Sequence, residues 1–424
     1  MTVNNMSEQD DFQNKLFIND NLGILNGLNS NSVDLVYLDP PFNSKRCYNA
    51  AIGSHAEGSS FKDIWTWQDV NQYQLDIIGA DYPELADFIE IIGRINDKSM
   101  MSYITYMAQR VIQLHRILKP TGSLYYHCDP TAGHFVKLML DAIFGRKNFR
   151  NEIVWCYGGG GMPRKDFGRK HDLIYRYSKT DDYYFNTQYK PYSEGTLKVP
   201  RHSTTSGGEA LDLERGTPLT DHWSDLPKLT SYKKSEWVGY PTQKPLALLE
   251  RIIKTSCPEN GIVLDPFCGC ATTCVAAEHL GRHWIGIDIE DEAVDILIQR
   301  LTDGQIGEGN GLKSVKPNFV KLKNPLKRTD VEYKNLKEPQ TYKEIKEFLY
   351  KKQNHICNGC GKEKYIEDFD IDHIIPKKAG GGDFMENYQL LCHHCNVMKG
   401  DKPMEFLLQR VEVIRKMRKY TSFE

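Results

Sequence analysis

Short apolar runs alternate with longer runs of helical period over most of the chain. Residues 33–38, VDLVYL, form a nearly continuous apolar run of the kind that builds a buried strand. Residues 100–118 have apolar positions at helical spacing, and LKPTG is expected to end that helix. Strands that alternate with helices predict an α/β fold with a doubly wound, mostly parallel sheet. The predicted strands lie at 15–20, 33–38, 123–129, 151–157, 171–179, 261–267 and 283–289.

The periodic pattern weakens in two places, and these divide the chain of 424 residues. Residues 182–238 are polar and irregular, which indicates an inserted lobe. Residues 303–337 are rich in Gly, Lys and Asn, as in a linker. We therefore expect a main domain over 1–302, a linker over 303–337 and a small terminal unit over 338–424.

Charge changes the picture only at the terminal unit. From Lys313 onward the chain carries 23 Lys and Arg against 16 Asp and Glu, although the whole chain has a net charge of −2. A basic end on an acidic body favours contact with an anion such as nucleic acid, or it is a solvated lysine-rich surface. The first residues, MTVNNMSEQDDF, lack the regions of a signal peptide, and no apolar run approaches transmembrane length. We expect a cytoplasmic protein without a membrane partner.

An acid and a glycine turn separate a predicted strand from a predicted helix in GIVLDPFCGCATT. Parallel sheets hold ligands at such turns, beyond the carboxyl ends of their strands. Asp288 ends the next predicted strand, 23 residues after Asp265, where an acid can bind ribose hydroxyls. A tight structural turn is the alternative, but the second acid favours a nucleoside-cofactor pocket. Neither G-x-G-x-x-G nor G-K-[ST] follows, so a dinucleotide fingerprint and a P-loop are excluded.

The run VDLVYL ends in Asp39-Pro40-Pro41-Phe42. An exocyclic amine of a nucleobase is a poor nucleophile, because its lone pair is conjugated into the ring. A carboxylate that accepts a hydrogen bond from the amine N–H makes the amine a better nucleophile. Two prolines restrict the backbone that carries this carboxylate, and an aromatic ring can stack on the base. An ordinary acidic turn is the alternative, and the cofactor pocket elsewhere in the sheet favours the chemical interpretation.

Together these segments resemble the β-group of DNA amino-methyltransferases over residues 15–300. DPFCGC is similar to the cofactor motif D-P-F-x-G-x-G-T-T of that group, with Ala271 in place of the second glycine, and D-P-P-[YF] precedes it in the chain. The resemblance implies a Rossmann-like sheet, double-stranded DNA as substrate, a flipped target base and a recognition region at 182–238. It implies that S-adenosylmethionine binds at Asp20, Asp265, Phe267, Gly269, Thr272 and Asp288, beside GYPTQKP at 239–245. Similar methyltransferases are often dimers, which leaves a homodimer open.

Asp39 favours adenine N6 as the methyl acceptor, because the Asp form of the motif mostly accompanies adenine and the Ser form accompanies cytosine N4. No Pro-Cys dipeptide occurs, so cytosine C5 chemistry is excluded. HCD at 127–129 closes a predicted strand, and we expect it to line the pocket without a metal.

The terminal unit contains two C-x-x-C pairs, which can close a tetrahedral zinc site. A unit of this size has little core, and zinc would supply folding free energy. The gap of 31 residues between the pairs exceeds the usual spacing, so a further segment is expected to fold between them. Four unrelated thiols are the disfavoured alternative. The four thiols belong to Cys357, Cys360, Cys392 and Cys395.

Residues 355–402 resemble the HNH nuclease family with its ββα-metal core, through C-x-x-C, D-H-I-I-P, E-N and C-x-x-C-N. The resemblance implies that His373 deprotonates water, that Asn387 orients His373, and that Asp372 and Asn396 hold Mg²⁺ or another divalent ion. His393 and His394 are expected to be structural or to face DNA.

The two resemblances predict a bifunctional DNA enzyme that methylates an exocyclic amine and cuts DNA. A single-chain restriction–modification system is one interpretation, and an enzyme of a phage or mobile element is another. The alternative to both is a cytosine-N4 methyltransferase whose HNH-like zinc unit only binds DNA.

Overall fold

The computed structural model describes most of the chain. The described residues are 14–44, 46–49, 60–63, 65–66, 72–158, 163–195, 214–229, 236–240, 242–302, 319–330, 341–379, 382–383 and 385–421. Much of the predicted recognition region and of the predicted linker therefore lies outside the described residues.

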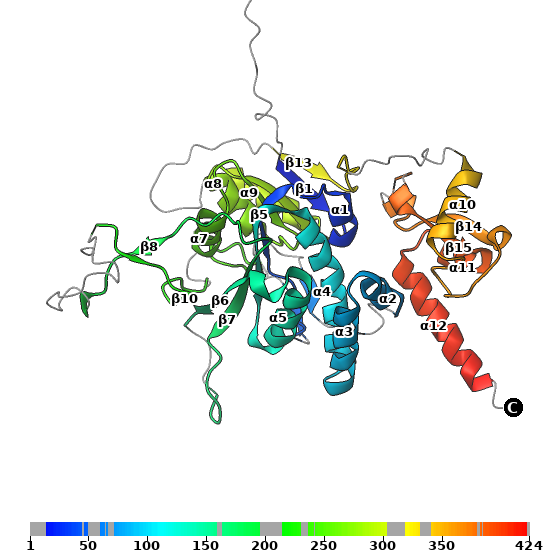
Figure 1. Cartoon of the computed structure of the whole chain (residues 1–424), viewed down its shortest axis with the longest axis horizontal. Helices are drawn as coiled ribbons and strands as arrows, with labels where there is room; N and C mark the ends of the chain where they lie inside the picture. Colours follow the sequence, from blue (N-terminus) through cyan, green and yellow to red (C-terminus); the bar gives the residue numbers. More distant parts are fainter. Residues whose placement is uncertain are drawn as a thin grey trace, which may run out of the picture.

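The larger part of the molecule has an α/β fold around one mostly parallel sheet, as the alternating pattern predicts (Figure 1). All neighbouring strands of this sheet pair in parallel except β7, which is antiparallel to both β5 and β6. The strand order is β10 (His222–Trp223), β6 (Phe149–Cys156), β7 (His171–Ser178), β5 (Leu118–Cys128), β2 (Val33–Leu38), β11 (Ile262–Asp265), β12 (His283–Asp288), β1 (Asn14–Ile18) and β13 (Phe319–Leu322).

The central strand β2 is buried on both faces, which explains its nearly continuous apolar sequence. Val36 and Leu38 belong to one apolar cluster, and Leu35 and Tyr37 belong to the other, because successive side chains of a strand point to opposite faces. The first cluster includes α1 (Asn21–Gly27), α2 (Gln72–Asp81), α3 (Pro83–Ile95), α4 (Lys98–Ile117) and α5 (Pro130–Phe144). The second includes α7 (Leu246–Ser256), α8 (Thr272–His279) and α9 (Glu292–Thr302).

Two sequence predictions need adjustment at their boundaries. LKPTG does follow the helix α4, but it already belongs to β5, which begins at Leu118. Residues 319–330 fall in the predicted linker, yet β13 adds an edge strand beside β1, and Thr329 and Asp330 bond to Asn29 and Ser30. Part of that segment is therefore packed on the main domain.

The described part of the terminal unit has its own small core. Strands β14 (Phe369–His373) and β15 (Tyr388–Cys392) pair antiparallel, and α11 (His393–Lys399) follows directly. Helix α10 (Tyr342–Lys352) begins with a capping box between Thr341 and Glu344, and α12 (Met404–Thr421) ends the unit. Short hairpin β3 (Arg46–Asn49) and β4 (Ser60–Asp63), and the pair β8 (Tyr189–Lys190) and β9 (Thr217–Pro218), lie outside these sheets. No helix within the described ranges is long and apolar enough to cross a bilayer.

The packing of β12 generates a stability prediction at Gly286. A Cβ atom there would lie 2.9 Å from Cys274 Sγ and 3.1 Å from Leu16 Cδ1, so Gly286→Ala overpacks the sheet. We expect the free energy of unfolding to fall by about 1–3 kcal/mol, measured by urea titration with tryptophan fluorescence. Gly158→Ala is the matched control, because nothing lies within 4 Å of its added Cβ. Equal stability of the two variants would contradict the packing described.

Candidate functional site

A cavity of about 540 Å³ opens beyond the carboxyl ends of β1, β2, β11 and β12. These four strands are parallel and adjacent in the sheet, so the residues that follow them meet at one edge. A volume of this size is typical of small-molecule sites. The cavity collects all the residues that the sequence predicts for the first site, namely Asp20, Asp39, Pro40, Pro41, Phe42, Asp265, Phe267, Gly269, Thr272 and Asp288.

Asp39 lines the cavity, and its two carboxylate oxygens have different surroundings. Its Oδ2 accepts a hydrogen bond from Nζ of Lys244, a residue of the same cavity wall. Its Oδ1 is buried and has no hydrogen-bond partner within the described residues, although Nδ1 of His127 lies 4.0 Å away. A buried acceptor without a partner is costly, and a ligand that donates an N–H bond removes that cost.

A buried histidine supports the floor of the cavity. The His127 side chain has no solvent exposure, its Nδ1 lies 2.9 Å from the Tyr37 hydroxyl, and its Nε2 lies 3.3 Å from Asp172 Oδ2. Burial alone would raise the pKa of Asp172, but its interaction with His127, the charge of Lys244 and the bond from Tyr157 lower it overall. The ring of Phe42 stacks against His127 at 6.0 Å between centroids. HCD was expected as pocket lining, but none of its three residues lines the cavity. His127 and Cys128 are buried, and Asp129 caps α5.

The glycine turn between β11 and α8 is held by the acid that precedes it. Asp265 is fully buried, accepts bonds from Phe267 N at 3.0 Å and Thr273 Oγ1 at 2.5 Å, and does not reach solvent. Burial, opposed by these bonds and reinforced by the charges of Asp39 and Asp288, raises its pKa to about 7. Its role in the structure is thus to brace the turn.

Two backbone positions make the turn tight. Gly269 has φ +50°, and a Cβ there would lie 3.0 Å from the ring of Tyr240. Ala271 has φ +57°, a left-handed conformation that glycine adopts without strain. The alanine that departs from the family motif therefore keeps the glycine-like backbone of that motif.

Asp288 and Asp20 lie on either side of the turn. Asp288 Oδ2 accepts the bond from Gly269 N at 2.7 Å. Asp20 caps α1 and pairs with Nη2 of Arg110 at 2.8 Å, and Nε of the same guanidinium bonds to Asn21 at 2.5 Å. Nearly half of the Asp20 side chain is exposed, so a carboxylate remains accessible at the cavity mouth.

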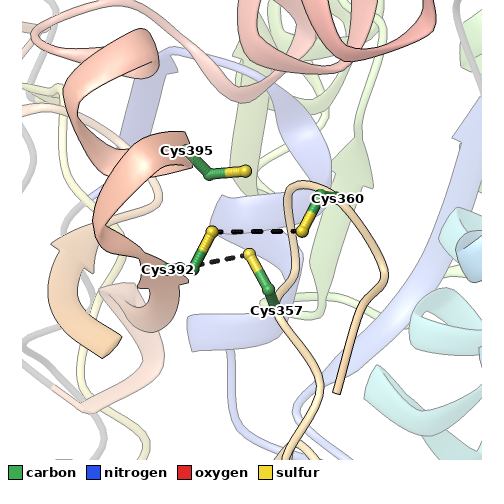
Figure 2. Close-up of side chains that lie close together, drawn as sticks. All are labelled: Cys357, Cys360, Cys392 and Cys395. Carbon is green, nitrogen blue, oxygen red and sulfur yellow. Dashed lines mark hydrogen bonds between the residues drawn. The ribbon is translucent and has the colours of Figure 1, made fainter. Parts of the chain in front are cut away.

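The four cysteines of the terminal unit converge on one point, as Figure 2 shows. Cys392 ends β15, Cys395 lies in α11, and Cys357 and Cys360 belong to the segment after α10. Their sulfur atoms all lie within 4.8 Å of one another, and Cys357 Sγ accepts a bond from Cys392 N at 3.2 Å. Four thiolates at this separation suit zinc, so the residues fit the predicted ion.

His373 ends β14 and is only partly exposed. Its Nε2 lies 2.7 Å from Asp383 Oδ1, and Lys377 and Tyr388 also bind that carboxylate. Asn387 does not contact the His373 side chain within the described residues. Its amide binds the main chain of Ile375 at 2.8 and 3.1 Å, so it fixes the loop that follows the histidine.

The two residues predicted as divalent-ion ligands have separate partners. Asp372 is buried and accepts bonds from Gln389 at 2.8 Å and from Lys399 Nζ at 3.1 Å. Asn396 donates to Asp370 Oδ2 at 3.1 Å. Asp370 and Asp372 are two residues apart in β14, so their side chains point to the same face of the strand. Helix α11 also contacts β14.

The sequence did not predict the individual roles of several residues in these sites. Lys244 and Tyr240 lie within the GYPTQKP segment that was assigned to the cavity, but their contacts with Asp39 and Gly269 need the fold. Asp383 had no local signal, because it lies in a loop. Asp172 had one, because it lies at the start of β7, and a search for acids that follow or begin strands would have found it.

Known proteins share both parts of this chain. Residues 33–299 match the family described as DNA methylase, and residues 357–402 match the family described as HNH endonuclease. The type II methyltransferase M.BglII of Bacillus subtilis is 26% identical over 315 residues, 72% of this chain and 72% of that protein. The DNA adenine methyltransferase YhdJ of Escherichia coli (strain K12) is 28% identical over 291 residues, 66% of this chain and 80% of that protein.

Solved structures include the PvuII DNA methyltransferase (cytosine-N4-specific), with 15% identity and a TM-score of 0.42 over 70% of this chain and 89% of that chain. The methylase match covers more than half of the chain and contains both Asp39 and Asp265. This membership supports S-adenosylmethionine as the methyl donor and DNA as the substrate. The chain therefore belongs to the DNA methylase family, and it also carries an HNH endonuclease domain.

Proposed function

We propose that this enzyme transfers a methyl group from S-adenosylmethionine to adenine N6 in double-stranded DNA and that its HNH domain cuts DNA. The observation that carries the first activity is the buried, unpartnered Oδ1 of Asp39. Asp39 lines the same cavity as the turn of Gly269 and the acid Asp288. An acceptor for an amine and a cofactor turn within one cavity are what methyl transfer to a base amine requires.

Each group of the chain has a defined part in this reaction. S-adenosylmethionine, when bound, supplies an activated methyl group. Lys244 holds one oxygen of Asp39, so that the other oxygen can accept an N–H of the target amine and turn its lone pair outward. Pro40 and Pro41 restrict the backbone that carries this carboxylate, and the ring of Phe42 offers a face to the base. Asp39 Oδ1 can also hold the proton that the amine loses.

Cofactor contacts follow the same edge of the sheet. Asp20 is accessible at the cavity mouth, where it would meet the adenine of the cofactor, and Asp288 would meet its ribose. Asp265 braces the turn that Phe267, Gly269 and Thr272 line. These roles fit the residues present, since the carboxylates reach the cavity from neighbouring strands.

Adenine is the proposed base for two reasons. The motif Asp39-Pro40-Pro41-Phe42 has the Asp form. A relative whose match covers 66% of this chain, at 28% identity, is named a DNA adenine methyltransferase. Cytosine N4 is the alternative, because its amine offers the same N–H donors. Mapping of methylated bases on mixed-sequence DNA separates the two.

Replacement of Asp39 tests the methyl-transfer site. We expect Asp39→Ala to lower kcat for methyl transfer at least 100-fold, because the amine loses its acceptor, and to change the affinity for S-adenosylmethionine less than threefold. Labelled methyl incorporation into DNA and calorimetric titration of the cofactor measure the two quantities. Asp87→Ala, an exposed acid on α3, is the control and should behave as the unsubstituted enzyme. Methylation by Asp39→Ala at the normal rate would exclude this role.

The nuclease proposal rests on the placement of His373 beside Asp383 in a ββα unit. His373 would deprotonate the attacking water, and Asn387 would hold the adjacent loop. Asp372 and Asn396 would hold Mg²⁺ or another divalent ion against the phosphate, after exchange of their present partners. Asp370 is a further carboxylate on the same strand face.

Replacement of His373 tests DNA cutting. We expect His373→Ala to abolish Mg²⁺-dependent cleavage, because no other base is held at that position, and to leave methyl transfer within twofold. Gel analysis of plasmid DNA and methyl incorporation by the same preparation measure both activities. His134→Ala, an exposed histidine on α5, is the control. Cleavage that survives in His373→Ala would favour a terminal unit that only binds DNA.

Replacement of one cysteine of the cluster tests the zinc site. We expect one zinc ion per chain by atomic absorption, and we expect Cys357→Ser to lose it together with the protection of the terminal unit from proteolysis, since zinc supplies folding free energy there. Cys156→Ser is the matched control, because this cysteine lies in β6 outside the cluster. Full zinc content in Cys357→Ser would refute the four-thiolate site.

A single-chain restriction–modification system would require that methylated DNA resist the HNH domain. Comparison of cutting on methylated and unmethylated DNA decides this. Equal cutting of both forms would instead favour an enzyme of a phage or mobile element.

A further inference from the structure

The turn between β6 and β7 carries the most exposed large apolar side chain in the described part of the protein. Phe167 is 99% exposed, whereas the next such residue, Tyr365, is 79% exposed. Single exposed apolar residues are common on protein surfaces and need no function by themselves. The position and the neighbours of Phe167 distinguish it.

Cations surround this aromatic residue. The described segment 163–170, PRKDFGRK, holds four cations and one acid. Arg164, Lys165 and Arg169 are exposed, and none of the ion pairs within the described ranges uses them. Lys228 lies 5.3 Å from the ring of Tyr157 and extends the basic surface at the base of the turn. Exposed cations of this kind bind the phosphates of nucleic acid.

A chain of contacts links the base of the turn to Asp39. Tyr157 N donates to Lys170 O at 2.9 Å, and the Tyr157 hydroxyl donates to Asp172 Oδ1 at 2.9 Å. Asp172 in turn contacts His127, which lies 4.0 Å from Asp39 Oδ1. An extended chain spans at most about 3.6 Å per residue, so Phe167 lies within about 18 Å of Asp172. Figure 1 shows this turn projecting from the ends of β6 and β7.

The proposed reaction requires that the target base leave the duplex, and the turn has residues that could stabilise the duplex without that base. A base that enters the cavity leaves a gap in the duplex, and its removal costs stacking and pairing free energy. Proteins that unstack DNA insert apolar side chains between bases while nearby cations hold the backbone. A projecting phenylalanine flanked by cations, on a turn whose base connects to Asp39, has both parts of such a device.

We propose that Phe167 enters the duplex beside the target base and fills the space that the base leaves, while Arg164, Lys165 and Arg169 bind the adjacent phosphates. The partner of this surface is duplex DNA, and the inference rests on the proposed methyl transfer. Phe167 contacts the bases next to the target and does not act on the reacting amine. Its contribution is therefore confined to substrates in which the target base is stacked.

The test compares native and heat-denatured DNA of mixed sequence, with labelled S-adenosylmethionine and no added Mg²⁺. We expect Phe167→Ala to lower kcat/KM about tenfold on native DNA and less than twofold on denatured DNA. Phe167→Leu keeps an apolar wedge and should remain within threefold of the unsubstituted enzyme on both. Ile95→Ala, which removes an exposed apolar side chain from α3, should change neither. Equal losses on the two DNA forms, or no loss on native DNA, would overturn the proposal.

A second measurement does not depend on methyl transfer. In the Phe167→Trp variant, native DNA should quench tryptophan emission more than it does in the unsubstituted protein, because an indole stacked on bases loses fluorescence. The absence of added quenching would overturn the wedge. If the unsubstituted enzyme methylates neither DNA form, the proposed function fails, and the quenching still decides whether residue 167 enters the duplex.

Discussion

The parallel register of four adjacent strands is the constraint on which the rest of the structure depends. Strands β1, β2, β11 and β12 run in one direction, so the residues after each strand meet at one edge although they span residues 19 to 288. Local turns alone could not join Asp39 to Asp265, because more than two hundred residues separate them. The sheet places the ends of these strands side by side, and the residues at those ends line the cavity.

That cavity concentrates carboxylates, and the molecule compensates for them with cations of two different kinds. Lys244 neutralises Asp39 from within, whereas Arg110 binds Asp20 at the rim and packs 3.2 Å over the ring of Tyr106. Among the described residues no ion pair joins a cation to Asp265, and its pKa is raised to about 7 by burial. Each of these carboxylates therefore has a different environment within one cavity.

Local patterns predicted the sheet and the segments of both sites, because strands and cysteine pairs leave a signal of short range. The period of VDLVYL identified β2, and the acids that follow β2, β11 and β12 identified the cavity wall. Individual partners such as Lys244, His127 and Asp172 could not be assigned, because their contacts arise from the crossing of distant segments. Residues 319–330 were mistaken for linker throughout because a strand of four residues, β13, shows little pattern until β1 lies beside it.

The packing of residues 319–330 sets the spatial relation between the two chemistries. Thr329 and Asp330 are bonded to Asn29 and Ser30, and the terminal unit begins at Thr341. The interval from Asp330 to Thr341 can span at most about 40 Å, which is close to one turn of B-form DNA. The terminal unit therefore begins within about 40 Å of the segment that packs on the main domain.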